Sequence, residues 1–230
     1  MSGDRPTPDL VLYFAPGACS GVTMIALEEI GVPFEARLVA FMAGEHRRPE
    51  FLARNPAGKV PTLMVDGQPL TQNPVILAWL ARRFPQAGLL PLGGDAIADA
   101  QLLGRLSWFS ADVHPLVTRI RMPQFMCDLP GAPERVRAMA GEAIRFHLAP
   151  LEQALAEAPW LLGDRWSVLD AYLFWVWFRI TGAGFAAAEY PAIAAHYERM
   201  SDRPSVRRAL VREDAAFAEL SGRGLAVPLS

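Results

Sequence analysis

The chain has 230 residues, 52% of them hydrophobic, and a formal net charge of −2 at pH 7. A chain of this length accommodates one large domain or two smaller ones, each with its own core. The small net charge excludes an electrostatic basis for binding nucleic acid or an anionic membrane surface, so we expect neither partner.

The first predicted elements are a strand over residues 10–14 and a helix over residues 21–30. The strand is an uninterrupted run of apolar, β-prone residues, and the helix has apolar residues at helical spacing before a glycine. The turn at residues 16–17 brings Cys19 and Ser20 to the start of the helix, where unpaired N–H groups and the helix dipole favour a thiolate. Cys19 is therefore a candidate for thiol chemistry, and the alternative is a small buried core residue.

Further strands and helices are predicted before residue 85, where a proline ends the last helix. They are a strand over 34–38, a short irregular helix over 45–54, strands over 62–65 and 68–70, and a helix from Asn73. Asp66-Gly67, between the last two strands, is a strong signal for a two-residue hairpin. This order predicts a mixed sheet with helices on both faces. We expect Tyr13, on the first strand, to belong to the core.

The rest of the chain is helical in pattern. Residues 85–94 are rich in proline and glycine and indicate a linker, and prolines within 122–133 interrupt the helices. Ser167 and Asp170 have the spacing of a capping box, with Asp in place of the usual Glu. Helical patterns cover residues 134–158, where Pro150 indicates a kink or boundary, and residues 168–180, 191–200 and 204–213. Trp108 and Phe109 are expected in the helical core or, alternatively, near a dimer contact.

The rarer residue types narrow the chemistry. The two cysteines, Cys19 and Cys127, lie far apart, which is no disulfide framework and suits a reducing cytosol. The four histidines show no ligand spacing, so we expect no metal site. No basic-then-apolar leader precedes the first strand, and the apolar run over 168–180 is too short and too polar to span a bilayer. We therefore expect a cytoplasmic protein.

Two motifs in the first half suit a small peptide thiol as ligand. In Lys59-Val60-Pro61 a proline stands directly before a strand, and a cis bond there would leave the Val60 N–H and C=O free to pair with an extended peptide. At Gln72-Asn73 a strand ends at a helix start, where Asn73 is a good N-cap and the helix N-terminus suits a carboxylate. Together with Cys19, these motifs predict a thioredoxin-like domain that holds a small peptide thiol.

On these residues the chain resembles the cytosolic glutathione transferases, and most closely their bacterial beta class. The resemblance covers nearly the whole chain in the family's order. It is carried by residues 12–20 (LYFAPGACS), 55–61 (NPAGKVP), 70–73 (LTQN) and 162–174 (LGDRWSVLDAYLF). The resemblance implies a thioredoxin-like N-terminal domain with a mixed four-stranded sheet over residues 1–86 and an all-helical C-terminal domain over residues 95–230. It further implies a homodimer, glutathione as cosubstrate, no metal, and a role in detoxification.

The resemblance also assigns roles to residues of this chain. Glutathione-binding residues are Lys59, Val60, Pro61, Gln72, Asn73 and His114. In that family the Val60 position pairs with the cysteinyl backbone of glutathione, and the Gln72-Asn73 position binds its γ-glutamyl end. The beta class places a histidine near the glutathione sulfur at the position of His114. The Cys19 position lies next to that sulfur and can form a mixed disulfide with it.

The favoured hypothesis is a glutathione-dependent transferase or thiol exchange enzyme. A glutathione thiolate, stabilised at the start of the first helix, would attack a hydrophobic electrophile or a disulfide. Cys19 is the catalytic candidate for covalent exchange, and Ser20 the candidate for simple conjugation. The electrophile pocket is expected between the domains, lined by Met24, Arg121, Met122 and Phe125. Arg121 at its edge suits an electrophile that carries an anion.

Two alternatives stay open. Gln72 lacks the negative charge that this family position more often has, which favours a non-catalytic binding or regulatory protein, in the manner of the stringent starvation proteins. A glutathione-dependent isomerase or dehalogenase ranks third, because the Ser-Ser-Cys pattern of maleylacetoacetate isomerases is absent at residues 17–19. Gly21 and Met24 also depart from the beta-class pattern.

Overall fold

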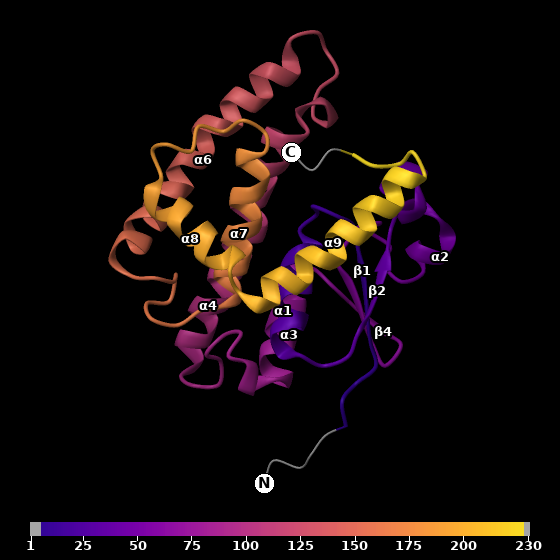
Figure 1. Ribbon diagram of the computed structural model, residues 1–230, viewed down its shortest axis with the longest axis vertical. Coiled ribbons are helices and arrows are strands. Elements are labelled where there is room, and N and C mark those ends of the chain that lie inside the picture. The colour runs from indigo at the N-terminus through magenta and orange to yellow at the C-terminus, as the bar shows by residue number, and fades with distance from the viewer. Residues whose placement is uncertain (1–5, 228–230) are drawn as a thin grey trace.

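Strand β1 (Leu10–Phe14) lies inside a four-stranded sheet in the computed structural model, which describes residues 6–227 (Figure 1). Its neighbours are β2 (Glu35–Leu38), which is parallel to it, and β3 (Thr62–Val65), which is antiparallel; β4 (Gln68–Thr71) forms the edge beyond β3. Asp66 and Gly67 join β3 to β4 with φ angles of 49° and 79°, as a two-residue hairpin turn requires. The predicted mixed sheet and its hairpin are confirmed.

Helices cover both faces of this sheet, as expected. They are α1 (Ser20–Ile30), α2 (Pro49–Leu52) and α3 (Asn73–Arg83), with 3₁₀ turns η1 (Phe41–Ala43), η2 (Glu45–Arg47) and η3 (Pro85–Ala87). Alternate residues of a strand face opposite sides. Leu10, Leu12 and Phe14 accordingly pack with α1 and α3 in the larger cluster of buried apolar residues, called here the main core. Val11 and Tyr13 pack with α2 on the other face of the sheet. Tyr13 is thus a core residue.

The segment that joins the sheet-bearing half to the helical half is fixed in place. Leu89 and Leu90 are buried in the main core. The Leu89 carbonyl accepts a hydrogen bond from the Val168 N–H at 2.9 Å. Composition indicated a linker at residues 85–94, and these two leucines anchor it to the helical half.

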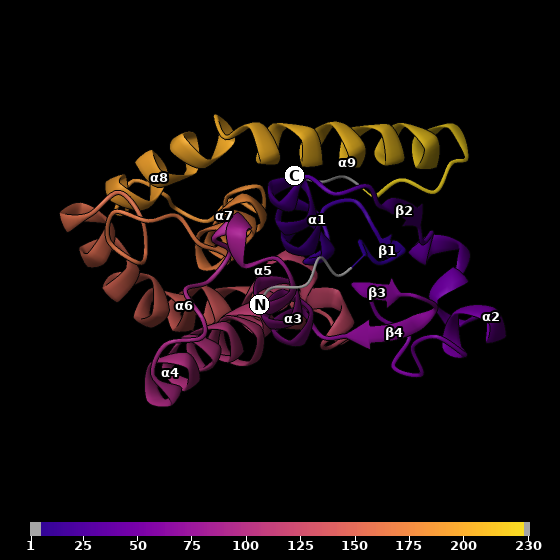
Figure 2. The same cartoon turned by 90° about the horizontal axis from the view of Figure 1, so that it is seen from below.

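The helical half surrounds one buried helix, α7 (Val168–Thr181), in which every residue from Val168 to Trp177 is buried (Figure 2). The predicted buried helix is confirmed. Phe109 is fully packed in the main core, and Trp108 packs partly buried against it. The elements of this half are α4 (Ala96–Trp108), η4 (Phe109–Val113), α5 (His114–Arg121), η5 (Pro123–Phe125), α6 (Ala132–Glu157), α7 (Val168–Thr181), α8 (Pro191–Ser201) and α9 (Pro204–Gly222).

Two prolines inside the helices have different consequences. Helix α6 continues through Pro150, so the boundary expected there is wrong. Pro150 leaves the carbonyl of Phe146 without an intrahelical donor, but Phe146 is 80% exposed, so water can satisfy the group at little cost. Pro115 lies in the first turn of α5, just after a π-helical turn, η4, that joins α4 to α5. The altered hydrogen-bond spacing of η4 accommodates the N–H group that proline lacks.

The Asp170 carboxylate organises the start of α7. Its Oδ2 accepts hydrogen bonds from the Ser167 N–H at 2.9 Å and the Ser167 hydroxyl at 3.0 Å. Its Oδ1 accepts one from the Leu161 N–H at 2.9 Å and lies 3.0 Å from Nε2 of His196 on α8. Ser167, Asp170 and His196 are fully buried. The predicted capping box is confirmed, and the same carboxylate also fixes the preceding loop and α8.

Helix α9 runs back from the helical half over α1 (Figure 2). Arg208 and Arg212 donate to the two carboxylate oxygens of Glu28 at 2.7 and 2.6 Å. Glu28 is only 8% exposed on its side chain, so these pairs are less screened than surface ion pairs. The expected helix end at residue 213 is too early, because buried residues of α9 continue to Leu220. Within residues 6–227, no helix is long and apolar enough to cross a membrane.

Replacing Asp170 with alanine is expected to lower the free energy of unfolding by about 3 kcal/mol, because it leaves buried donors at Ser167 and Leu161 without an acceptor. Urea unfolding followed by circular dichroism measures the change. Asp164→Ala, in the exposed loop just before the capping box, is the matched control and is expected to cost less than about 0.5 kcal/mol. Equal losses in the two variants would contradict the assigned role of Asp170.

Candidate functional site

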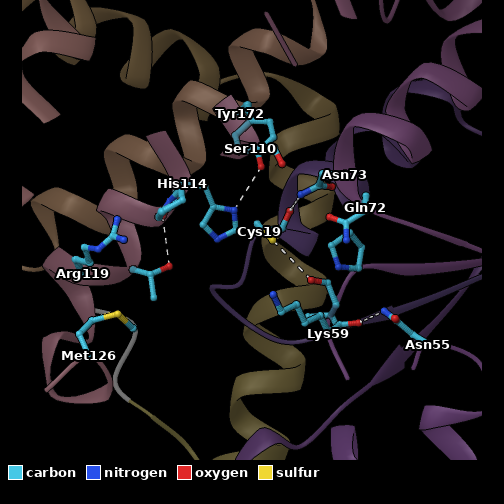
Figure 3. A pocket seen from close by; sticks show the side chains of 14 residues that line it. Cys19, Asn55, Lys59, Gln72, Asn73, Ser110, His114, Arg119, Met126 and Tyr172 are labelled. Atoms are coloured by element: carbon cyan, nitrogen blue, oxygen red, sulfur yellow. Dashed lines mark hydrogen bonds between the residues drawn. The ribbon is translucent and has the colours of Figure 1, made fainter. Parts of the chain in front are cut away.

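A cavity of about 310 Å³, called here the first cavity, lies where the sheet-bearing half meets α5 and α7 (Figure 3). The structure brings together at this cavity the predicted residues Cys19, Lys59, Val60, Pro61, Gln72, Asn73 and His114. Its remaining lining residues are Asn55, Ser110, Pro115, Thr118, Arg119, Met126 and Tyr172. In Figure 3, Cys19 stands between a wall with Lys59 and Gln72 and a wall with His114 and Arg119.

The turn between β1 and α1 that presents Cys19 is held at Gly17 from both sides. Gly17 has a φ of 68°, a conformation that glycine adopts without a steric cost. Its N–H donates to Oε2 of Glu213 on α9 at 3.1 Å, and its carbonyl accepts from the indole Nε1 of Trp175 on α7 at 3.1 Å. Two helices of the helical half therefore fix the turn before Cys19.

Asn73 fixes the same turn from the start of α3. Its Nδ2 donates to the Cys19 carbonyl at 2.8 Å, and its Oδ1 accepts from the Thr23 hydroxyl at 2.6 Å. Asn73 was expected to cap α3, but the cap position belongs to Gln72, whose φ is 69° and whose side chain makes no capping hydrogen bond. The buried Asn73 side chain instead forms hydrogen bonds with the Cys19 carbonyl and with Thr23 of α1.

The Cys19 thiol is protonated at neutral pH in these surroundings. Burial raises its pKa to about 12, against the opposing effects of the Cys19 backbone N–H and the Lys59 ammonium. The Sγ–H group donates to the Val60 carbonyl at 3.7 Å. The expectation that the helix start favours a thiolate at Cys19 is therefore wrong, since the loss of hydration outweighs the favourable groups.

Ser20 does not reach the first cavity. It is fully buried, and its hydroxyl accepts from the Ala15 N–H at 3.2 Å and donates to the Ala15 carbonyl at 3.3 Å. The hydroxyl closes the turn and has no side facing a ligand. The expectation that Ser20 activates a thiol for conjugation is thus corrected, because local hydrogen bonds of this kind compete with any outward role.

His114 presents a neutral ring to the first cavity. Burial, with the positive charge of Lys59, lowers its pKa to about 4. Its Nδ1 lies 3.5 Å from the Tyr172 hydroxyl, and its ring stands edge-on to Trp175 with 4.6 Å between centroids. Burial raises the pKa of Tyr172 above its ordinary range. Both groups can donate or accept a hydrogen bond without bringing a charge to the cavity.

The loop before β3 is organised by Asn55, which is buried. Its Nδ2 donates to the Lys59 carbonyl at 2.7 Å and to the Thr62 hydroxyl at 3.0 Å. The Val60–Pro61 bond is cis, which meets the condition stated for this motif, but the Val60 carbonyl is not free, because it accepts from the Cys19 thiol. The charged residues that line the first cavity are the cations Lys59 and Arg119, and no carboxylate is among its described lining residues. The cavity therefore has the charge to receive an anionic ligand.

A second cavity, of about 720 Å³, lies against the same turn. Residues 15–18 line it, as do the predicted residues Arg121, Met122 and Phe125. Most of its surface is apolar, and its cationic lining residues are Arg47, Arg121 and Arg179. Burial and the neighbouring Arg121 lower the pKa of Arg179 to about 10, which still leaves it charged at pH 7. The turn before Cys19 thus separates two cavities.

Met24 does not belong to either cavity. It is fully buried in the main core on α1. Its place in the predicted electrophile pocket is corrected, because the apolar face of α1 packs inward, against the rest of the main core.

Several lining residues of the first cavity were not predicted. Ser110 and Thr118 lie four residues before and after His114, and this helical spacing could have found them. Tyr172 follows the capping box by two residues. Arg119 and Met126 had no comparable signal. Within residues 6–227, no group of three or more His, Cys, Asp or Glu residues could hold a metal ion.

Known protein families match the two halves of the chain separately. Residues 8–82 match the model of the glutathione S-transferase N-terminal domain, and residues 121–211 match that of the C-terminal domain. The maleylacetoacetate isomerase of Pseudomonas aeruginosa is 32% identical over 188 residues, which are 80% of this chain and 87% of that protein.

Solved structures agree with these matches. The structure of a sphingomonad glutathione S-transferase complexed with glutathione is 35% identical, covers 89% of this chain and 98% of its own, and has a TM-score of 0.77. A bacterial beta class glutathione S-transferase of Sphingomonas chungbukensis is 34% identical, covers 88% of this chain and 98% of its own, and also has a TM-score of 0.77. With both domains matched in order, the chain belongs to the glutathione S-transferase family.

Proposed function

We propose that this protein binds glutathione in the first cavity and joins its sulfur to the electrophilic carbon of a largely apolar substrate in the second cavity, a substrate that carries an anionic group. The observation that carries the proposal is the position of the Cys19 turn, which lines both cavities. Glutathione carries a net negative charge at neutral pH, and the cations Lys59 and Arg119 on the cavity wall suit it. Val60 supplies the backbone groups for its cysteinyl part, and Gln72, which also lines the cavity, receives its γ-glutamyl end.

The proposed chemistry uses the glutathione sulfur as the nucleophile. Bound glutathione loses its thiol proton to solvent, and its thiolate attacks the electrophilic carbon while the leaving group departs with the bonding electrons. Cys19 keeps its own proton, because burial raises the pKa of its thiol to about 12. Its S–H group then donates to the glutathione thiolate in place of the Val60 carbonyl, and the Lys59 charge stabilises the same thiolate. Exchange with a disulfide follows the same course, with a thiolate as the leaving group.

A glutathione-dependent isomerase is the second candidate function. Maleylacetoacetate isomerase of Pseudomonas aeruginosa is a relative over most of the chain, and the arginines of the second cavity suit a dicarboxylic substrate. In this mechanism the glutathione thiolate adds to a carbon–carbon double bond, and the resulting single bond rotates. Elimination then regenerates glutathione. Assays of conjugation with 1-chloro-2,4-dinitrobenzene and of isomerisation with a maleyl-substituted oxo acid separate the two candidates.

The proposal includes a homodimer in the cytoplasm, which the family resemblance implies. It also retains the division into a glutathione-binding domain over residues 1–86 and a helical domain over residues 95–230. Turnover of an electrophile, together with glutathione binding, separates the transferase from the non-catalytic alternative.

Titration of reduced glutathione into the protein by isothermal calorimetry is expected to give saturable binding in the micromolar-to-millimolar range. Cys19→Ala is expected to keep the affinity within about threefold and to lower kcat for conjugation about tenfold, because it removes only the S–H donor. Cys127→Ala, which lies outside both cavities, is the matched control and should change neither quantity. No binding at several millimolar would contradict the transferase and favour the non-catalytic protein.

Replacing Arg121 with methionine is expected to lower kcat/KM about tenfold for 4-chloro-3-nitrobenzoate, whose carboxylate it would bind. The methyl ester of the same compound is expected to lose less than about twofold. Steady-state kinetics of the parent and the variant with both electrophiles measure the ratio of kcat/KM for the acid to kcat/KM for the ester. Arg119→Met is the control on the same helix: it lines the first cavity, so it should raise the KM for glutathione and leave the ratio unchanged. An equal loss with both electrophiles in Arg121→Met would argue against an anion-binding role.

A further inference from the structure

Glu213 reaches from α9 into the turn before Cys19, and Gly21 leaves room for it. The Glu213 Oε2 accepts from the Gly17 N–H at 3.1 Å, and the residue is only 8% exposed. A Cβ atom on residue 21 would lie 2.8 Å from Oε1 of Glu213, closer than two such atoms can approach. Gly21 departs from the beta-class pattern. Because it has no side chain, it leaves the space that the Glu213 carboxylate occupies when α9 packs over α1.

The carboxylate brings a negative charge to the start of α1. Burial raises the pKa of Glu213 to about 7, opposed by the hydrogen bond from Gly17 and by the charge of Arg179 on α7. Asp214, next to it on α9, acts in the same direction as burial. The Oε1 atom is buried without a hydrogen-bond partner among the described residues. Above neutral pH the carboxylate thus lies ionised near the helix end that would otherwise favour a thiolate at Cys19.

We propose that Glu213 is a positioning residue for Cys19: its carboxylate holds the turn through Gly17, and its negative charge adds to burial in disfavouring the thiolate form of the Cys19 sulfur. The charged and titratable groups that act on Cys19 are Lys59, Tyr172 and Glu213. Lys59 favours the thiolate, and Glu213 opposes it. Burial is the main obstacle to ionisation of Cys19, and these two charges adjust it in opposite directions.

The benefit of this arrangement rests on the proposed function. A Cys19 thiolate beside a glutathione thiolate would repel it and could donate no hydrogen bond. A Cys19 thiol can donate one. The Glu213 charge therefore acts together with burial to reserve the negative charge of the site for the sulfur of the substrate.

The test measures alkylation of Cys19 by iodoacetamide in the full chain without glutathione, with Cys127 replaced by serine so that one thiol remains. Glu213→Gln keeps the acceptor for Gly17 and removes the charge. Its alkylation is expected to be about three- to tenfold faster than that of the parent at about pH 8, because each unit of pKa changes the thiolate fraction tenfold. The ratio should approach one at about pH 5.5, where the Glu213 carboxyl is protonated in the parent.

Asp214→Asn is the matched control, since it removes an exposed carboxylate from the next position of α9, and its alkylation rate should stay within about 1.5-fold of the parent. Equal rates for Glu213→Gln and the parent at every pH, or slower alkylation of the variant, would overturn the proposal. The measurement needs no glutathione, so it stands even if the protein fails to bind that ligand.

A second pair of variants tests the geometry independently of charge. Gly21→Ala is expected to lower the thermal midpoint when Glu213 is present, because its methyl group meets the carboxylate. In a Glu213→Ala background the same substitution should not lower the midpoint, since the space is then empty. Equal losses in both backgrounds would contradict the match between the two residues. If Glu213→Gln does not fold, the pH dependence of alkylation in the parent tests the charge: the rate should rise less steeply with pH between about 6 and 8 than that of a free thiol, because the Glu213 carboxylate forms over this range.

Discussion

The turn between β1 and α1 is the constraint on which the two cavities depend. It is fixed at Gly17 by Glu213 and Trp175, and at the Cys19 carbonyl by Asn73. A buried hydrogen bond contributes about 1 kcal/mol, but losing one partner costs about 1–3 kcal/mol because the other is left unsatisfied. The residues that hold the turn come from α3, α7 and α9, which follow it in sequence by more than fifty residues. The sulfur position is therefore a property of the whole chain, and the two halves cannot separate without releasing it.

Helix α7 connects the structural core to the chemistry. Tyr172, Trp175 and Arg179 are spaced by three and four residues, so they lie along one face of the helix. Along that face Tyr172 lines the first cavity, Trp175 holds the turn, and Arg179 lines the second cavity. The start of this helix is fixed by the buried Asp170. The capping box thus has a consequence beyond stability, because a rotation of α7 would move all three groups at once.

The sequence predicted the elements better than it predicted the roles of single side chains. The strand over 10–14, the Asp66-Gly67 hairpin and the capping box were recognisable because each depends on neighbours along the chain. Half of the residues that line the first cavity were recognisable through the family resemblance. Ser20 and Met24 were misplaced, because the direction of a side chain at a helix start depends on tertiary packing. The match between Gly21 and Glu213 could not be predicted, because the two residues are distant in sequence and meet only when α9 lies over α1.

The protonation state of the Cys19 sulfur depends on two opposing effects of different size, the helix dipole and burial. A helix N-terminus stabilises an anion by about 0.3–1 kcal/mol, and by about 2 kcal/mol in favourable partly buried geometries. A rise in pKa from 9.0 to about 12 corresponds to roughly 4 kcal/mol against the thiolate. Burial therefore prevails over the helix dipole, and a nearby carboxylate adds to it. A cysteine at a helix start ionises only when hydration or nearby charge offsets its burial, so local sequence alone does not determine whether such a cysteine attacks or donates.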